Sequence, residues 1–362
     1  MRVLHLTDRV TSRGGAHRHL LGVVESLREM GYDAPIAAGV RSVVWPIAGY
    51  KPYDRPDPQV VPGLEAREAV AVDLGPLVER VRPDVIHVHT VVNPAVLEWA
   101  AEAGAIITVQ DHRYFCPGRG KWTRDGAVCR DAMSPSVCAS CFDEGGYYDD
   151  ILGLTTRRLE ALQKMRAVVV LSQCMKDELA AAGVGGARVH VIPPFVHGLD
   201  THATPDGPPC VLVVGRLVEH KGIADAVDAW RRSKVDLPLV VAGTGPLREE
   251  MEAKGAEVLG WLDPPALSRV YARARALLLT PRWQEPFGIA GLEAATMGVP
   301  VVAWESGGIR EWHSGPLAAW GDVESLAEML REAVKGRAMP PRVPSREEVM
   351  ARLLALYRDL SG

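Results

Sequence analysis

Residues 188–215, RVHVIPPFVHGLDTHATPDGPPCVLVVG, decide the fold. The stretch begins and ends with short apolar runs, 188–192 and 210–215. The segment between these runs holds five prolines and two glycines and has no helical period. This composition predicts a linker over residues 193–209. The apolar runs on its two sides therefore belong to different domains.

Short runs of valine, isoleucine and leucine alternate with longer amphipathic segments on both sides of the linker. None of the runs alternates polar with apolar residues, which indicates parallel strands covered on both faces by helices. We expect strands at 2–6, 84–89, 105–109, 167–172 and 188–192, and again at 210–215, 237–243, 274–280 and 299–304. The sequence thus predicts two doubly wound α/β domains, 1–192 and 210–344, facing each other across a central cleft. Ligands bind such sheets at the carboxyl ends of the strands.

The composition is that of an ordinary soluble globular protein, with 362 residues of which 47% are hydrophobic and 24% charged. The net charge of −4 gives no support for a nucleic-acid partner. No apolar run reaches the roughly 18 residues of a transmembrane helix, and Asp8 comes too early for a secretory signal peptide. We therefore expect a cytoplasmic protein, with at most peripheral contact at the inner face of the membrane.

Two loops that follow predicted strands carry groups suited to phosphate. Gly14 and Gly15 precede a predicted helix, where backbone N–H groups can approach an anion, although a plain tight turn explains them equally well. Arg216 follows the strand at 210–215 directly, and Lys221 comes just before the next helix. Arginine offers a planar fork to phosphate oxygens and lysine a mobile point charge. Either cation alone would be a solvated loop charge, but two at one strand end suit a departing diphosphate.

Residues 280–304, TPRWQEPFGIAGLEAATMGVPVVAW, place Glu285 and Glu293 eight positions apart. A Pro-Phe-Gly turn and a short run of helix formers separate them. A glutamate near a helix start can serve the helix dipole alone. The spacing also places one carboxylate in a turn and the other inside the helix that follows.

The segments GRLVEHKG (215–222) and EPFGIAGLEA (285–294) together resemble the retaining glycosyltransferases of family 4. The loop GGA, DVIHVHT, AGTGPLREEM and YARARALLLTPRWQEPFG agree with that family in order and spacing, so the resemblance covers most of the chain. It implies the GT-B fold, with two Rossmann-like domains. It also implies that a C-terminal helix, 345–362, crosses back onto the N-terminal domain.

The same resemblance implies transfer of a sugar from a UDP- or GDP-linked donor to a glycan, a lipid-linked acceptor or a small molecule. Transfer would proceed with retention and without a catalytic metal. Arg216 and Lys221 would hold the diphosphate, Glu285 would orient the sugar and stabilise its developing positive charge, and Glu293 would accept the ribose hydroxyls. The other donor contacts that it implies are Gly14, Gly15, Gln110, His112, Gly243, Leu262, Phe287, Gly288 and Ile289.

One departure from the family concerns the residues after the strand at 105–109. Family members often carry histidine followed by aspartate there, whereas this chain has Gln110, Asp111 and His112. Gln110 can hydrogen-bond a sugar but cannot titrate near neutral pH, and His112 serves only if the loop turns. A catalytically silent sugar-nucleotide-binding protein and a GT-B sugar-nucleotide epimerase therefore stay as alternatives, and a zinc-stapled nucleic-acid module is a third. His87 and His89 are expected to be strand residues that face flanking elements.

Four of the six cysteines fall in a polar segment, 112–145, with few strand or helix signals. Cys116, Cys129, Cys138 and Cys141 are separated by twelve, eight and two residues. A Cys-x-x-Cys pair is a common half of a tetrahedral zinc site, so the four form a candidate structural zinc site in a Cys-rich insertion. Reduced, loosely packed thiols are the alternative. The basic run that follows, 155–166, favours a solvated helix face over a surface for an anionic acceptor or a membrane.

Overall fold

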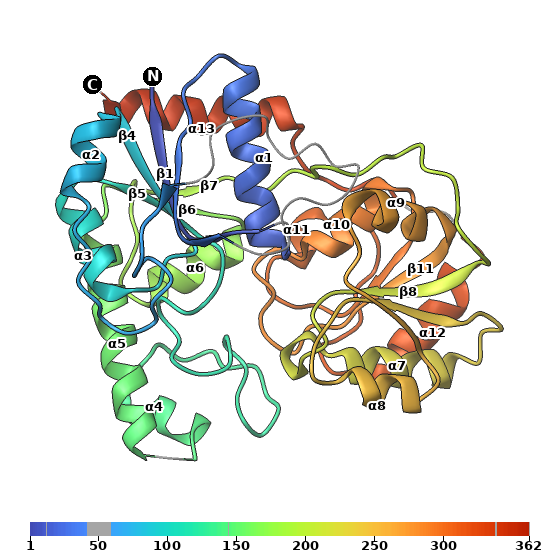
Figure 1. Ribbon diagram of the computed structural model, residues 1–362. Helices are drawn as coiled ribbons and strands as arrows, with labels where there is room; N and C mark the ends of the chain where they lie inside the picture. Colours follow the sequence, from blue (N-terminus) through green and yellow to red (C-terminus); the bar gives the residue numbers. More distant parts are fainter. Residues whose placement is uncertain (12, 42–58, 144, 337–338, 362) are drawn as a thin grey trace. The chain divides into compact units, whose positions relative to one another are not determined.

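The computed structural model describes residues 1–11, 13–41, 59–143, 145–336 and 339–361. The chain divides into two compact units, Met1–Phe195 with Pro344–Gly362, and Val196–Val343 (Figure 1). Each unit is built on one parallel sheet. The expectation of two parallel α/β sheets is therefore confirmed.

The first unit holds a seven-stranded sheet in the order β3-β2-β1-β4-β5-β6-β7, in which all neighbours are parallel. Its strands are β1 (Val3–Val10), β2 (Ile36–Arg41), β3 (Gln59–Val60), β4 (Val85–His89), β5 (Ile106–Val109), β6 (Ala167–Val170) and β7 (Val189–Val191). The five strands expected before the linker are all present. The sequence did not indicate β2 and β3, which complete one side of the sheet.

Helices cover both faces of this sheet. They are α1 (Gly15–Glu29), α2 (Gly75–Val81), α3 (Pro94–Glu102), α5 (Gly145–Lys164), α6 (Gln173–Ala181) and α13 (Arg346–Ser361). A short helix α4 (Pro135–Cys138) and a 3₁₀ turn η1 (Ala139–Cys141) lie in the segment between β5 and α5 and bury no residue. Successive strand residues point to opposite faces. Leu4 and Leu6 of β1 accordingly pack in a core with α3, α5 and α6, while Val3 packs in a core with α1 and α13.

The C-terminal helix α13 is part of the first unit. It lies against α1 and β4. In Figure 1, α13 is the red helix beside the blue helix α1. Tyr357 of α13 is fully buried, and its hydroxyl lies 2.6 Å from Nδ1 of His87. Arg346 donates a hydrogen bond of 2.8 Å to the Ser26 hydroxyl of α1. The last helix therefore completes the core of a sheet formed by the first half of the chain.

The second unit holds a five-stranded parallel sheet in the order β10-β9-β8-β11-β12. Its strands are β8 (Cys210–Val214), β9 (Leu239–Ala242), β10 (Glu257–Gly260), β11 (Ala274–Leu279) and β12 (Val301–Ala303). Only β10 was not expected from the sequence. The strand order reverses between β8 and β11, and doubly wound sheets bind ligands at that switch point.

The helices of the second unit also cover both faces of their sheet. They are α7 (Ile223–Ser233), α8 (Arg248–Ala253), α9 (Pro264–Arg273), α10 (Ile289–Thr296), α11 (Ile309–Trp312) and α12 (Val323–Ala333), with a 3₁₀ turn η2 (Glu219–Lys221) before α7. One core joins the sheet to α7, α8 and α12, and another joins it to α9 and α10. Among the described residues, no helix combines the length and apolar character needed to cross a bilayer.

Candidate active site

The loops that follow β8 and β11 touch each other at the switch point of the second unit. A Cβ on Gly222 would lie 1.6 Å from the backbone oxygen of Thr280, so only glycine allows this approach. The Thr280 hydroxyl also donates a hydrogen bond of 2.7 Å to the Gly222 carbonyl. This contact brings together two predicted site residues that are far apart in sequence, Lys221 and Glu285.

Lys221 and Glu285 form an ion pair. The Lys221 ammonium donates a hydrogen bond of 2.8 Å to Oε2 of Glu285, and the indole N–H of Trp283 donates one of 2.6 Å to the same oxygen. The ammonium also lies 4.4 Å from the centre of the Trp283 ring, within the range of a cation–π contact. Trp283 is thus a third member of the site. The sequence analysis did not identify it, and its position two residues before Glu285 was the available signal.

Glu285 is ionised although it is only 8% exposed. Burial by itself would raise the pKa of this carboxyl, but the positive charge of Lys221 and the hydrogen bonds from Lys221 and Trp283 hold the pKa below its usual value. The site therefore contains a buried carboxylate whose charge a neighbouring ammonium balances.

The loop after β12 holds the Glu285 turn in place. The backbone N–H of Glu285 donates to the Ser306 hydroxyl at 3.2 Å, and this hydroxyl donates to the Trp283 carbonyl at 2.7 Å. The Gly308 N–H donates to the Glu285 carbonyl at 2.8 Å. Backbone and hydroxyl groups from a third strand end thus fix the position of the carboxylate.

Arg216, the second predicted cation, also follows β8 but does not join the ion pair. Its side chain is exposed, and its guanidinium lies 3.2 Å from Nε2 of His220. The His220 ring is 4.8 Å from the Trp283 ring, measured between centroids. Arg216 is therefore close to the site, and in the described part of the chain its guanidinium contacts an imidazole nitrogen and not a carboxylate, so it can reorient towards an anion.

The turn after Glu285 leads directly into α10. Gly288 caps this helix with φ of 87°, a conformation that favours glycine. Phe287 is 2% exposed, and its carbonyl accepts a hydrogen bond of 2.5 Å from the Trp312 indole. The first N–H groups of any α-helix, here those from Ile289 onward, have no acceptor within the helix. This end of α10 is accordingly suited to an anion.

Glu293 lies inside α10 in a different environment from Glu285. It is 2% exposed, and its Oε2 lies 3.0 Å from the hydroxyl of Tyr271 in α9. Tyr271 is itself fully buried, and its hydroxyl is also 3.1 Å from the Ala290 carbonyl. The two glutamates of the segment thus differ in partner, since one faces a cation and the other faces a phenol.

The remaining predicted residues of the second unit lie along the same sheet edge. Gly243 follows β9, and a Cβ there would be 1.7 Å from the Gly215 oxygen. Leu262 follows β10 and is half-buried against the core shared with α9 and α10. Because all five strands are parallel, their carboxyl ends meet at one edge. That edge carries every donor residue predicted for this unit.

In the first unit, the switch point between β1 and β4 carries residues that the sequence did not single out as functional. Asp8 of β1 accepts a hydrogen bond of 2.6 Å from the Thr90 hydroxyl and lies 3.0 Å from Nε2 of His17 in α1. Burial would raise the pKa of Asp8, but the hydrogen bonds and charge of His17, the bond from Thr90 and the charge of Arg9 lower it to about 2. The available signal was a carboxylate at the carboxyl end of the first strand of the chain.

The four predicted residues of the first unit lie near strand ends. Gly14 has φ of 86° and precedes α1, whose first residue is Gly15. Gln110 follows β5 and is 8% exposed, and within the described chain neither atom of its buried amide has a hydrogen-bond partner. Such groups are uncommon and call for an explanation, for which a bound polar ligand is one. His112 is 2% exposed, with its ring 5.4 Å from that of Phe115.

His5, His87 and His89 form a buried cluster in β1 and β4 whose ligand atoms lie within 4.8 Å of one another. Nδ1 of His5 is 3.0 Å from Nε2 of His89, while the two nitrogens of His87 lie 2.6 Å from the Tyr357 hydroxyl and 2.7 Å from the Thr108 hydroxyl. Burial lowers the pKa of His5 to about 3 and those of His87 and His89 well below the usual value. Because both nitrogens of His87 are hydrogen-bonded, we interpret the cluster as a neutral clamp that holds α13, rather than as a metal centre.

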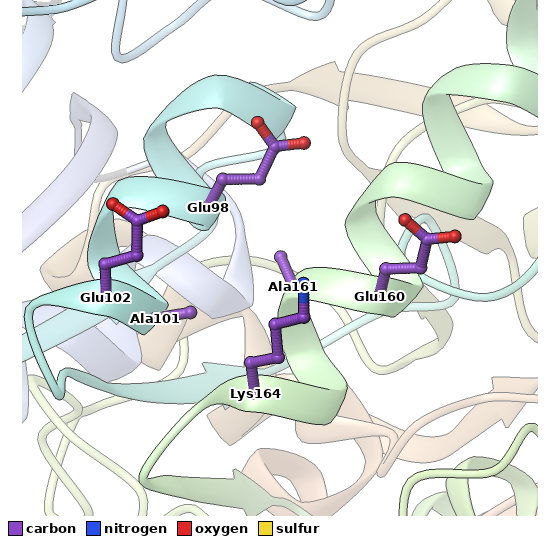
Figure 2. Close-up of a pocket in the computed structure, with 6 residues that line it drawn as sticks. All are labelled: Glu98, Ala101, Glu102, Glu160, Ala161 and Lys164. Atoms are coloured by element: carbon purple, nitrogen blue, oxygen red, sulfur yellow. The ribbon is translucent and has the colours of Figure 1, made fainter.

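A surface hollow between α3 and α5 has no part in this chemistry. Figure 2 shows its lining, which consists of Glu98, Ala101, Glu102, Glu160, Ala161 and Lys164. Glu98 is engaged there by two hydrogen bonds of 2.7 Å from Arg157. The hollow lies on helix surfaces and not at the carboxyl edge of the sheet, which is where the polar residues of both units gather.

Comparisons with known proteins agree with this arrangement of strand-end residues. The family model Glycosyltransferase Family 4 matches residues 13–197, more than half of the chain, and the model Glycosyl transferases group 1 matches residues 200–348. A glycogen synthase of Mycobacterium tuberculosis is 28% identical over 289 residues, which are 72% of this chain and 62% of that protein. This chain thus spans less than two thirds of the length of that relative.

Two solved structures have the same fold. The sucrose-phosphate synthase of Thermosynechococcus elongatus has a TM-score of 0.66 at 16% identity, covering 99% of each chain. The Anabaena protein HepE, solved with UDP and glucose, has a TM-score of 0.63 at 18% identity, covering 100% of this chain and 94% of its own. These likenesses confirm the GT-B fold expected from the sequence. The match of the family model over residues 13–197 shows that the chain belongs to glycosyltransferase family 4.

Proposed function

We propose that this protein is a nucleotide-sugar-dependent glycosyltransferase that transfers a sugar with retention of configuration. The observation that carries the proposal is the ion pair of Lys221 and Glu285 at the switch point between β8 and β11. An ionised carboxylate and an ammonium held 2.8 Å apart at this edge suit a substrate with a cationic sugar transition state and an anionic leaving group. The names of the relatives support the reaction class, since they include a glycogen synthase and an α-maltose-1-phosphate synthase.

Lys221 and Arg216 are the groups proposed to carry the charge of the departing diphosphate, without a catalytic metal. A lysine ammonium has three N–H donors, of which Glu285 takes one, so Lys221 can donate to phosphate oxygens without leaving the carboxylate. Arg216 is exposed and can turn its planar fork towards the same phosphates. In the proposed front-face reaction, the bond from the sugar C1 to the diphosphate oxygen breaks and the acceptor oxygen bonds to C1. A diphosphate oxygen takes the acceptor proton.

The two glutamates are proposed to contact opposite ends of the donor. Glu285 would orient the sugar and stabilise the positive charge on C1, while Glu293 would accept the ribose hydroxyls. The eight positions from one to the other span roughly 8–12 Å, about the distance from a hexose to a ribose folded over a diphosphate. Backbone N–H groups of Phe287, Gly288 and Ile289 would bind the sugar hydroxyls.

The base is proposed to lie beside the loops after β9 and β10. Gly243 and Leu262 would present backbone groups there, so the side chains leave UDP and GDP as equal candidates. The solved structure of HepE, which has the same fold, contains UDP, and this supports testing UDP sugars first.

The first unit is proposed to contribute the acceptor side and the remaining donor contacts. The buried amide of Gln110 lacks hydrogen-bond partners within the described chain, which suits a sugar hydroxyl. Gly14 and Gly15 at the start of α1 would approach a phosphate, and His112 would assist only after a rearrangement of its loop. The acceptor is a glycan, a lipid-linked acceptor or a small molecule.

Gln110 also suggests a second candidate function, that of a protein that binds a sugar nucleotide but does not catalyse transfer of the sugar. This residue stands where the family often has a histidine, and an amide cannot exchange a proton near neutral pH. A GT-B epimerase is a weaker candidate because it needs titrating acids and bases around the sugar, whereas the paired Lys221 and Glu285 balance each other's charge.

A thermal-shift panel tests the donor site first. Wild type and Glu293→Ala would be heated with UDP, GDP, ADP, TDP and their common sugar conjugates. A ligand at 100 times its Kd adds about 2.7 kcal/mol to the unfolding free energy. We expect one nucleotide to stabilise wild type and not the variant, and a panel without any shift would remove the main support for a transferase.

Turnover then separates an enzyme from a silent binding protein. The nucleotide sugar that binds best would be incubated with wild type, Lys221→Ala and Arg216→Ala, and release of the nucleoside diphosphate would be measured with and without candidate acceptors. We expect each substitution to lower kcat/KM by more than about tenfold, equivalent to 1.4 kcal/mol. Unchanged turnover in either variant would exclude the role given to that residue.

A further inference from the structure

The Cys-rich segment after β5 is ordered without a hydrophobic core of its own. From Thr123 to Asp143 no side chain is buried, although the segment includes a hairpin, the helix α4 and the turn η1. Hydrophobic burial is the main force that offsets the entropy lost on ordering a chain. Small segments that lack a core are commonly held by disulfides or by a metal ion.

The fold of this segment brings the four cysteines together. Cys138 ends α4 and Cys141 ends η1, so the two thiols are one turn apart. Burial raises the pKa of the Cys138 and Cys141 thiols, and the nearby thiols of Cys116 and Cys129 raise both pKa values further. Thiols from both ends of the segment are therefore neighbours.

Two backbone features create this convergence. A Cβ on Gly118 would lie 3.3 Å from Cβ and 3.6 Å from Sγ of Cys141, so the loop after Cys116 passes directly beside Cys141. The bridge between Trp122 and Val128 closes a hairpin, after which the Cys129 N–H donates to the Lys121 carbonyl at 2.9 Å. All four cysteines are half-buried and free of disulfides.

We propose that Cys116, Cys129, Cys138 and Cys141 bind one structural zinc ion that orders residues 116–141. Four thiolates satisfy the tetrahedral preference of Zn²⁺, and a closed four-sulfur site leaves no position for a substrate. The histidine cluster is more tightly gathered than the sulfurs, but its His87 nitrogens are already hydrogen-bonded. The Cys129 thiol, by contrast, donates to the Asp131 carbonyl over 3.9 Å, a long hydrogen bond that a metal can replace. Metal binding would therefore draw the segment together and tighten it.

The ordered segment is attached to the body of the first unit by Lys121. This side chain is 5% exposed, and its ammonium contacts the Asp131 carbonyl at 2.5 Å and the Glu178 carboxylate of α6 at 3.0 Å. The zinc ion would thus fix a loop that begins just after Gln110 and His112. It holds the surroundings of those residues and takes no part in the reaction.

Metal analysis of purified full-length protein tests the site directly. We expect about one equivalent of zinc in wild type and in Cys174→Ser, a matched control because Cys174 is a half-buried cysteine in α6 outside the segment. We expect loss of zinc in Cys138→Ser and its recovery in Cys138→His, which supplies another good zinc ligand. Less than about a tenth of an equivalent in wild type, with none taken up on adding Zn²⁺, would overturn the proposal.

A protease experiment on wild type and a nucleotide-binding control keep the test independent of variant folding and of glycosyl transfer. Removing the metal from wild type with a chelator should make residues 123–143 sensitive to protease, and Zn²⁺ should restore protection. Unchanged protease sensitivity would contradict a structural role. An equivalent of iron in place of zinc, or disulfides between these cysteines in the isolated protein, would also overturn the assignment. Nucleotide binding by the second unit serves as the folding control, so its loss would bear on the donor site and not on the zinc site.

Discussion

Mild acid is expected to unfold the first unit through its buried histidine cluster. His5, His87 and His89 are 0–1% exposed, and burial lowers their pKa values, for His5 to about 3. In the unfolded chain each imidazole has a pKa near 6.5. Above that pH both states are neutral and the cluster causes no pH dependence. As the pH falls below 6.5, the unfolded chain binds protons that the folded chain cannot accept, so stability is lost.

The loss of stability at a given pH depends on how far that pH lies below the pKa of histidine in the unfolded chain. At pH 5, about 1.5 units below the unfolded pKa, His5 favours the unfolded state by about 2 kcal/mol, because its folded pKa is about 3. His87 and His89 act in the same direction, and a loss of a few kcal/mol is a large fraction of the stability of an ordinary domain. Carboxylates with lowered pKa values, such as Asp8, act in the same direction but only below about pH 4.

The assay needs to report on the first unit alone. Hydrogen exchange of the peptide that contains β4, measured at several urea concentrations from about pH 7 to about pH 5, gives the opening free energy of that sheet. His89→Leu should reduce the pH dependence, whatever it does to stability at pH 7. His202→Gln, in the exposed segment before β8, is the matched control and should leave it unchanged. An identical pH dependence in His89→Leu and wild type would refute the argument.

Three other substitutions test the second unit. Gly222→Ala should lower the free energy of unfolding by more than about 2 kcal/mol, because its Cβ would overlap a carbonyl oxygen at 1.6 Å and φ is 63°. Gly153→Ala in α5 of the first unit is the control, and it should raise stability by about 0.5–1 kcal/mol because nothing lies within 4 Å of its Cβ. Urea unfolding measures both. Tyr271→Phe removes the hydroxyl beside the buried carboxylate of α10 and should reduce the thermal shift given by nucleotide at a stability cost of about 1 kcal/mol. Lys221→Met should destabilise the unit by about 1–3 kcal/mol because Glu285 loses its cation, and adding Glu285→Gln should recover most of that loss.

The central strands could be predicted from the sequence because they are buried on both faces. The runs at 210–215 and 274–280 became β8 and β11, whose residues are almost all apolar. Two of the three strands that were missed, β3 and β10, lie at sheet edges, where one side meets solvent and polar residues are tolerated. The third, β2, is paired on both sides, but its apolar run consists largely of alanine and glycine. β10 begins with the exposed Glu257, and β3 is only two residues long. Neither gives the continuous apolar pattern on which the prediction depended.

The candidate site could be predicted to the extent that it depends on strand ends. Parallel strands release their following residues at one edge, so the neighbourhood of Lys221 and Glu285 followed from two strand assignments. Trp283 and Ser306 did not follow, because their contacts depend on how two loops fold against each other. The same holds for Tyr357, which meets a histidine 270 positions away. No local pattern encodes such a pairing.

The two glutamates of the 280–304 segment show why spacing alone could not assign their chemistry. Glu285 lies in the turn before α10 and Glu293 lies inside the helix. The turn η2 supplies an ammonium to Glu285, whereas α9 supplies a phenol to Glu293. A carboxylate beside a cation keeps its charge balanced before any substrate arrives, so its removal should alter the electrostatics that a leaving group meets. A carboxylate that accepts from one hydroxyl has further lone pairs and can accept from other hydroxyl groups. Glu285→Gln is therefore expected to lower turnover with little effect on nucleotide affinity. Glu293→Gln should weaken nucleotide binding first, and variants that lose both properties together would contradict this division.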